Sequence, residues 1–336
     1  MKFGHVALAD AVGSISAHAV RAGEIVLRKG SRVTREIAEK LEAAGVEGIV
    51  AARLDPEDVH EDEAAAMLAR KLAGKGIRID PPFTGRANLF AQTSGVLRLD
   101  RALIDAVNGV DEAITFATLP AFRSVSTGEM VATVKIIPYA VPREALDRAM
   151  AKAGAPLISI APYARRRIAA ISTLLPGLKP AVVVKTMEIL SKRLEPAGAV
   201  VVFEERVPHE IAPLADALRR ALATSPDIVI VFGASAISDR RDVIPAAVEA
   251  AGGRIEHLGM PVDPGNLLLI AELADAPVLG APGCARSPKE NGFDWVLQRL
   301  LAGLPVGRAE VVGMGVGGLL MEIKSRPQPR AEPPKT

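Results

Sequence analysis

The sequence predicts an α/β protein of two domains, an N-terminal α+β domain and a C-terminal domain built on a mostly parallel sheet. Beyond about residue 155, short apolar strands alternate with helical segments, which is typical of βαβ units. Before that point, strands and helices follow one another without such a rhythm. The length of 336 residues allows two domains, each with its own core. We expect these domains over residues 1–155 and 156–325, followed by a flexible tail over 326–336 that is rich in proline and charge.

In the N-terminal domain the clearest element is a helix predicted over 34–44. Ile37, Leu41 and Ala44 recur at spacings of three and four residues, which places them on one helical face. Gly45 then occupies the position that favours glycine after a helix. Periodicity and turn residues also predict strands over 25–27 and 130–137 and helices over 64–72 and 101–107.

The C-terminal domain is predicted as an alternating series of strands and helices. We expect strands over 168–172, 199–203, 228–232 and 278–280, and helices over 185–194, 211–222, 243–251 and 292–302. Parallel strands in such a series end at one edge of the sheet, and ligands of open α/β folds bind at that edge.

Charge and composition exclude several classes of protein. The 41 basic and 39 acidic side chains give a net charge of +2, too small an excess to attract nucleic acid. Aromatic residues make up 3%, which leaves few side chains for stacking bases. Apolar runs are broken before the about 20 residues of a membrane-spanning helix, and the first residues lack the apolar core of a signal peptide. We therefore expect a cytoplasmic protein that binds neither nucleic acid nor membrane.

Histidine and cysteine spacing predicts no zinc site. The five histidines are scattered without a pair at a ligand spacing, and the single Cys284 forms no disulfide within the chain. A lone cysteine is more often a small buried side chain than a nucleophile. His209, at the start of a predicted helix, is expected to make a local hydrogen bond, and no Ser-His-Asp triad is suggested.

The polar loop after the predicted strand over 228–232 is the strongest candidate for a binding or catalytic site. It consists of small and polar residues and leads into a helix that opens with Asp242 and an early proline. Backbone N–H groups at such a helix start, at the carboxyl edge of a sheet, attract anions. Ser235 and Ser238 can donate hydrogen bonds to a phosphate, while Arg240 and Arg241 can supply positive charge.

Asp242 has two interpretations that the sequence does not separate. Its carboxylate could hold a Mg²⁺ ion that neutralises a transferring phosphate. Aspartate is also a favoured N-cap, and proline is tolerated in the first helical turn, so Asp242 could simply cap the following helix. The two arginines before it could likewise be solvated surface charges.

Two later turns, which we call the second and the third turn because they follow the polar loop, place proline and glycine beside apolar runs. Taken alone, each is an ordinary connection between elements. The third turn, however, gathers several donors for an anion at the end of a predicted strand, so three loops of one sheet could converge on one pocket. The residues concerned are Pro264, Gly265 and Asn266 in the second turn, and Pro282, Gly283, Arg286 and Ser287 in the third.

These three segments together resemble the molybdopterin-binding domain of molybdenum cofactor biosynthesis proteins, the bacterial relatives of gephyrin. The family pattern is a glycine-rich loop ending in R-D-V-T-P, then a K-P-G-K-P turn, then a P-V-x-G-L-P-G-N-P loop. This chain has GASAISDRRDVIP, MPVDPGNLLL and PVLGAPGCARS in the same order. The resemblance covers roughly residues 160–325 and implies a Mog-type domain of three layers.

The resemblance implies a role in molybdenum cofactor biosynthesis. Relatives transfer an adenylyl group from Mg-ATP to molybdopterin or insert molybdate into it, and they form homo-oligomers. By this resemblance the chain binds molybdopterin or its nucleotide form, with Asp242 as the catalytic and Mg²⁺-binding residue of a transferase-like protein. The residues expected to bind the cofactor, from the resemblance and from the anion chemistry above, are Gly233, Ala234, Ser235, Ser238, Arg240, Arg241, Pro264, Gly265, Asn266, Pro282, Gly283, Arg286 and Ser287.

The chain departs from the family pattern at several positions. Ala234 replaces a glycine of the first loop, and its Cβ atom occupies space that glycine leaves empty. Asp263 and Asn266 stand where molybdate-inserting relatives carry two lysines. These substitutions are similar to those in the molybdopterin-binding half of fusions with a cytidylyltransferase, so the nucleotide could be ATP or CTP.

Two alternative functions stay open. The first is a non-catalytic scaffold or carrier that docks a partner nucleotidyltransferase. The second is an unrelated nucleotide-binding enzyme, because other doubly wound folds share the same anion-binding edge.

Overall fold

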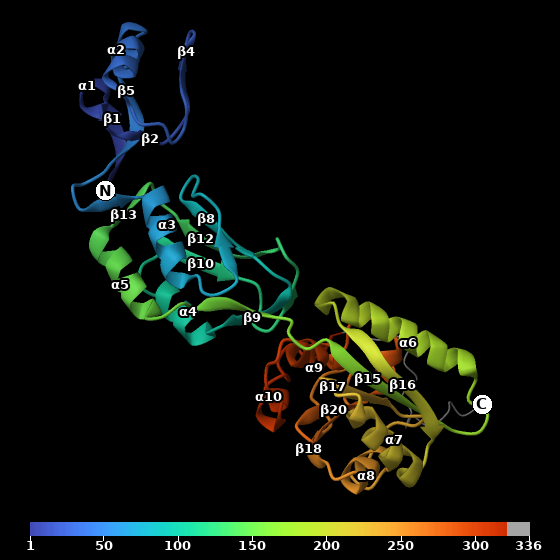
Figure 1. Ribbon diagram of the computed structural model, residues 1–336. Helices are drawn as coiled ribbons and strands as arrows, with labels where there is room; N and C mark the ends of the chain where they lie inside the picture. Colours follow the sequence, from blue (N-terminus) through green and yellow to red (C-terminus); the bar gives the residue numbers. More distant parts are fainter. Residues whose placement is uncertain (321–336) are drawn as a thin grey trace, which may run out of the picture. The chain divides into compact units, whose positions relative to one another are not determined.

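The computed structural model describes residues 1–320, and the chain forms two compact units that divide between Pro162 and Tyr163 (Figure 1). The sequence places the boundary at 155/156. The strand β14 (Ile158–Pro162) pairs with β9 (Gly95–Leu99), so this segment is part of the first unit. The tail expected over 326–336 lies outside the described residues.

The first unit begins with short strands and two helices: β1 (Lys2–Ala7), α1 (Leu8–Ala11), β2 (Ile15–Ser16), the hairpin of β3 (Val20–Ala22) and β4 (Ile25–Leu27), α2 (Arg35–Ala43) and β5 (Gly48–Arg53). Strands β1, β5 and β2 form an antiparallel sheet in that order. Thr34 Oγ1 accepts the N–H of Ile37 over 3.3 Å and so caps α2. The helix turns Leu41 into a buried cluster with Leu8 and Ile49.

The rest of the first unit consists of short strands around three helices: β6 (Asp58–His60), α3 (Glu61–Leu72), β7 (Ile77–Ile79), β8 (Arg86–Ala91), β9, α4 (Arg101–Asn108), β10 (Ile114–Thr118), β11 (Ser124–Val125), β12 (Met130–Ile136), β13 (Ala140–Pro142), α5 (Arg143–Ala153) and β14. Strands β10, β12, β8 and β7 form an antiparallel sheet in that order. Leu68 of α3 packs with Leu89 of β8 and Val134 of β12 in the largest buried cluster of this unit. The unit is therefore an α+β domain, as expected.

The second unit alternates strands and helices: β15 (Arg167–Leu174), α6 (Pro180–Leu194), β16 (Val200–Pro208), α7 (Ile211–Ala223), β17 (Ile228–Phe232), α8 (Val243–Ala250), β18 (Arg254–Leu258), β19 (Leu269–Leu273), β20 (Ala276–Ala281), α9 (Gly292–Leu301) and α10 (Arg308–Val312). The sheet order is β16-β15-β17-β20-β19-β18. The first four strands run parallel, and β19 and β18 run antiparallel to their neighbours.

Helices cover both faces of this sheet, α7 and α8 on one side and α6 and α9 on the other (Figure 1). On the first face, Val231 of β17 packs in one cluster with Leu218 of α7 and Val248 of α8. On the opposite face, the ring centroids of Phe232 and Phe293 of α9 lie 6.5 Å apart. The three layers and the mostly parallel sheet confirm the predicted fold class.

The strands β18 and β19 were absent from the sequence prediction. Each is five residues long, and the segment MPVDPGNLLL, which the sequence analysis treats as a turn, ends at Leu269, the first residue of β19. Helix α6 begins at Pro180 rather than at residue 185, because proline is favoured at the first helical position. Over residues 1–320, every helix is too short or too polar to cross a membrane.

Candidate functional site

Three loops of the second unit lie at the edge of the sheet where the parallel strands end. We call residues 233–242, after β17, the first loop, and residues 282–291, after β20, the third loop. The second loop, residues 259–268, joins β18 to β19. It lies at the same edge, because Leu269 pairs with Gly280 near the end of β20. The structure thus brings together the three segments that the sequence singled out.

Arg286 links the third loop to the first. Its Nη2 donates to the carbonyl oxygen of Gly233 over 2.9 Å, and its guanidinium lies 5.9 Å from the centre of the Phe232 ring. Its Nε is buried and has no hydrogen-bond partner among residues 1–320. Burial lowers the pKa of the Arg286 guanidinium, yet arginine stays charged at neutral pH. A buried cationic donor without an acceptor indicates a place for an anion.

A chain of hydrogen bonds connects the first loop to the ends of β15 and β16. The N–H of Ala234 donates to Thr173 Oγ1 over 2.8 Å. Thr173 Oγ1 lies 2.8 Å from His209 Nδ1, and His209 Nε2 lies 2.9 Å from Ser235 Oγ. His209 therefore makes more than the local hydrogen bond expected from sequence, because it joins Thr173, near the end of β15, to Ser235, which follows β17.

The first loop also offers backbone donors. The N–H groups of Ser235 and Ala236 have no hydrogen-bond acceptor among residues 1–320. Both residues are exposed, so these donors can reach a ligand. A Cβ atom at Gly233 would lie 2.7 Å from the backbone oxygen of Ser235 and from Ile244 Cδ1, so packing by itself accounts for glycine at this position.

Asp242 caps helix α8. Its Oδ1 accepts the N–H of Val243 over 2.7 Å, and its Oδ2 accepts the N–H of Ser238 over 3.3 Å. Within the described residues, no three His, Cys, Asp or Glu side chains gather where they could hold a metal ion. Mg²⁺ is often bound by one or two carboxylates together with substrate phosphates, so Asp242 alone would need a phosphorylated ligand to complete such a site. The catalytic and Mg²⁺ roles of Asp242 remain predictions.

The two arginines of the first loop face solvent. Arg241 Nε pairs with Asp239 Oδ1 at 2.8 Å, and the arginine side chain is 92% exposed. This pairing raises the pKa of Arg241 and lowers that of Asp239. Arg240 is also exposed. Burial lowers the pKa of the His257 imidazole, and the positive charges of Arg308 and Arg240 lower it further.

The second loop packs against the start of α9. Gly265 has φ +144°, and a Cβ atom there would lie 2.9 Å from the Cα of Gly292. The N–H of Gly292 donates to the carbonyl oxygen of Pro264 over 2.8 Å. Asn266 is exposed, and its Nδ2 donates to the carbonyl oxygen of Met260 over 3.4 Å. Close packing of two backbones accounts for Gly265 without a ligand.

Arg193 of α6 holds the third loop in place, a role that the sequence analysis missed. Its Nη1 donates to the carbonyl oxygen of Ala285 over 2.7 Å, and its Nη2 donates to that of Ser287 over 2.6 Å. No local signal distinguishes Arg193 from other helical arginines in the sequence.

The proline and the glycine of the third loop differ in their surroundings. Pro282 is buried, whereas Gly283 is exposed. A Cβ atom added at Gly283 would meet no atom of the described residues within 4 Å. Packing therefore does not require glycine at this position.

Cys284 also lies in the third loop, and its thiol is half-buried. Burial raises the pKa of this thiol above its ordinary value. The protonated form is therefore favoured, which does not suit a nucleophile.

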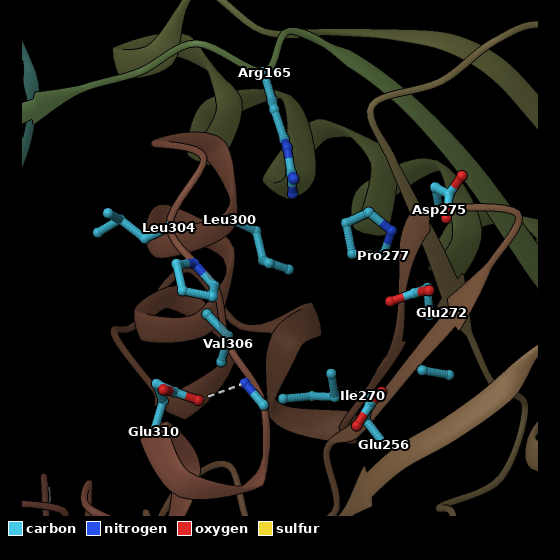
Figure 2. A pocket seen from close by; sticks show the side chains of 13 residues that line it. Arg165, Glu256, Ile270, Glu272, Asp275, Pro277, Leu300, Leu304, Val306 and Glu310 are labelled. Atoms are coloured by element: carbon cyan, nitrogen blue, oxygen red, sulfur yellow. Dashed lines mark hydrogen bonds between the residues drawn. The ribbon is translucent and has the colours of Figure 1, made fainter.

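A cavity of about 330 Å³ lies elsewhere on the second unit, between the β18–β19–β20 side of the sheet and the end of α9 (Figure 2). Leu300, Leu304 and Ile270 give it apolar walls, while Glu256, Glu272, Asp275 and Glu310 contribute carboxylates. Figure 2 also shows Arg165 reaching toward it. The described residues that line this cavity include none of those predicted to bind a cofactor.

Residues 178–303 match a family model described as "Probable molybdopterin binding domain". The matched residues all lie in the second unit, and the match confirms that this unit resembles the molybdopterin-binding family. None of the curated proteins compared with the chain matches it significantly.

Three solved structures are similar at low sequence identity. The molybdopterin biosynthesis MoeA protein from Pyrococcus horikosii is 15% identical, over 90% of this chain and 75% of its own, with a TM-score of 0.31. The protein CinA from Thermoplasma acidophilum is 19% identical, over 38% and 91%, with a TM-score of 0.27. NadC from Streptococcus pyogenes is 17% identical, over 57% and 72%, with a TM-score of 0.16. TM-scores this low do not establish a shared overall fold.

Proposed function

We propose that the second unit binds molybdopterin, or its nucleotide form, through the pterin phosphate at the three loops, and that it acts in molybdenum cofactor biosynthesis. The observation that carries this proposal is Arg286, whose buried Nε has no acceptor within the described part of the chain. A phosphate oxygen would supply the missing acceptor and the opposite charge.

The neighbouring groups support the same ligand. Ser235 and Ala236 are exposed, their N–H groups have no acceptor among residues 1–320, and they follow shortly after Gly233, whose carbonyl oxygen accepts from Arg286. Backbone N–H groups and a guanidinium together are typical of phosphate sites. The family match over residues 178–303 supports a molybdopterin-related pterin as the molecule that carries the phosphate.

The test is a titration of the full-length protein with molybdopterin, followed by pterin fluorescence. We expect Arg286→Ala to weaken binding roughly tenfold to a hundredfold, because a hydrogen bond to a charged group contributes about 1.5–3 kcal/mol. Arg219→Ala is the matched control, since Arg219 pairs with Asp216 on the exposed side of α7. Absence of binding by the folded parent protein, or equal affinities for the parent and Arg286→Ala, would overturn the proposal.

Two forms of this function remain to be distinguished by experiment. As an enzyme, the protein would transfer a nucleotidyl group from ATP or CTP, or insert molybdate, with Mg²⁺ at Asp242. As a carrier, it would bind the pterin and present it to a separate nucleotidyltransferase. The capping bonds of Asp242 to Val243 and Ser238 favour the carrier, because they give the carboxylate a structural use. Incubation with molybdopterin, Mg²⁺ and either nucleotide tests the enzyme directly through formation of a nucleotidylated pterin.

A further inference from the structure

The hydrogen-bond chain from Ala234 through Thr173 and His209 to Ser235 has a buried hydroxyl inside it and an exposed side chain at its end. Thr173 is 0% exposed, while Ser235 is exposed in the first loop. The chain is therefore anchored inside the unit and terminates at the surface where the proposed phosphate would bind. Its three contacts are 2.8, 2.8 and 2.9 Å long.

The number of hydrogens on each group determines which group donates and which accepts at each hydrogen bond. We call this order the direction of the hydrogen-bond chain. Thr173 Oγ1 accepts from Ala234, so its own single hydrogen needs another acceptor. Among residues 1–320, His209 Nδ1 is the acceptor in reach of that hydroxyl. A buried hydroxyl hydrogen without an acceptor is strongly disfavoured, so Thr173 donates to Nδ1. A neutral imidazole that accepts at Nδ1 carries its hydrogen on Nε2, and His209 therefore donates to Ser235 Oγ.

We propose that this chain fixes the hydroxyl of Ser235 as an outward donor to a phosphoryl oxygen, with Thr173 and His209 as positioning residues. Because Ser235 Oγ accepts from His209, its own hydrogen points away from the imidazole. The identity of the ligand rests on the proposed function, whereas the direction of the chain does not.

The direction also decides what kind of group Ser235 is. In a nucleophilic serine site, histidine accepts the serine hydrogen and so raises the reactivity of the oxygen. Here His209 donates, so Ser235 binds the ligand and does not attack it. A phosphoryl oxygen only accepts hydrogen bonds, which matches a chain that ends in a donor.

The first experiment measures the tautomer of His209 by ¹⁵N NMR of full-length protein labelled at histidine. We expect the His209 imidazole to carry its hydrogen on Nε2. The signal of His209 is the one that the His209→Gln variant lacks. Thr173→Ser keeps the hydroxyl and should keep this tautomer of His209. In Thr173→Val the hydroxyl is lost, and His209 should no longer favour one tautomer. A hydrogen on Nδ1 in the parent protein overturns the proposal, and this result does not depend on whether Thr173→Val folds.

The second experiment measures molybdopterin affinity across a double-mutant cycle. Ser235→Ala should weaken binding roughly tenfold. Thr173→Val should weaken it in the parent but add nothing in the Ser235→Ala background, because Thr173 acts through that hydroxyl. Unchanged affinity in Ser235→Ala, with a parent that binds, overturns this proposal and leaves the proposed function standing. A parent that does not bind overturns the proposed function, and the NMR result still tests the direction of the chain.

Discussion

Arg193 of α6 and Asp294 of α9 form an ion pair in which Nε and Oδ1 lie 2.5 Å apart and each side chain is 10% exposed. Asp294 also accepts the N–H of Asn291 over 2.9 Å as part of a capping box at the start of α9. Because Arg193 also donates to three carbonyl oxygens of the third loop, one guanidinium orders both the helix start and the loop that carries Arg286.

Replacing Arg193 by alanine is expected to lower the free energy of unfolding by about 3–5 kcal/mol, because it leaves the Asp294 carboxylate buried without its cation. Urea denaturation followed by circular dichroism measures the change. Arg148→Ala removes the exposed pair with Glu144 on α5 and should cost less than about 1 kcal/mol. Equal losses of unfolding free energy in the two variants would show that the buried pair of Arg193 stabilises the protein no more than an exposed pair does.

Asp242 can be tested with two substitutions that separate capping from catalysis. Asparagine also caps helices, so Asp242→Asn should keep the stability nearly unchanged, whereas Asp242→Ala should cost about 1 kcal/mol. Thermal denaturation measures both effects. If Asp242→Asn binds molybdopterin normally but abolishes nucleotidyl transfer, the carboxylate is catalytic. If only Asp242→Ala has any effect, and only on stability, Asp242 is a helix cap.

Gly265 and Gly283 were both predicted to bind the cofactor, and the structure separates them. Gly265→Ala should destabilise the second unit by about 1–3 kcal/mol, because its φ of +144° is strained for alanine and the new Cβ would meet Gly292. Gly283→Ala should leave the stability unchanged, since no atom of residues 1–320 lies within 4 Å of the added Cβ. Denaturation curves check both statements. A loss of molybdopterin affinity in a stable Gly283→Ala variant would then report contact with the ligand.

Glu61, at the start of α3 in the first unit, is 8% exposed and lies 3.5 Å from the Nζ of Lys135. Burial raises the pKa of this carboxyl above the ordinary glutamate value of 4.5, and Lys135 offsets part of the effect. A raised pKa in the folded state favours the protonated form. The contribution of Glu61 to stability is therefore fully present below pH 4.5 and is lost as the pH rises through the folded-state pKa.

We accordingly expect Glu61→Gln, which stays neutral, to gain stability relative to the parent as the pH rises from about 4 to about 7. Urea denaturation at several pH values measures this difference. Glu144→Gln, at an exposed pair with Arg148 on α5, is the matched control. A difference between Glu61→Gln and the parent that stays constant across this pH range would contradict the expectation.

Much of the second unit was predictable because its elements are encoded locally. The strand over 228–232 is entirely buried and appears with the expected bounds, since a continuous apolar run suits a central parallel strand. The three loops were found from turn residues and from the donors clustered around Arg286. The short strand β18 was missed, because at a sheet edge its residues alternate too weakly to be recognised.

The sequence by itself determined the alternation of strands and helices, the three loops at one sheet edge and the excess of anion donors there, because periodicity, turn chemistry and composition act over a few neighbouring residues. Only the tertiary structure decided which side chains meet. Arg193 and Asp294 are 101 positions apart, and Thr173 and Ala234 are 61 apart. Hydrogen bonds between such residues depend on the order of strands in the sheet, and no local pattern encodes that order.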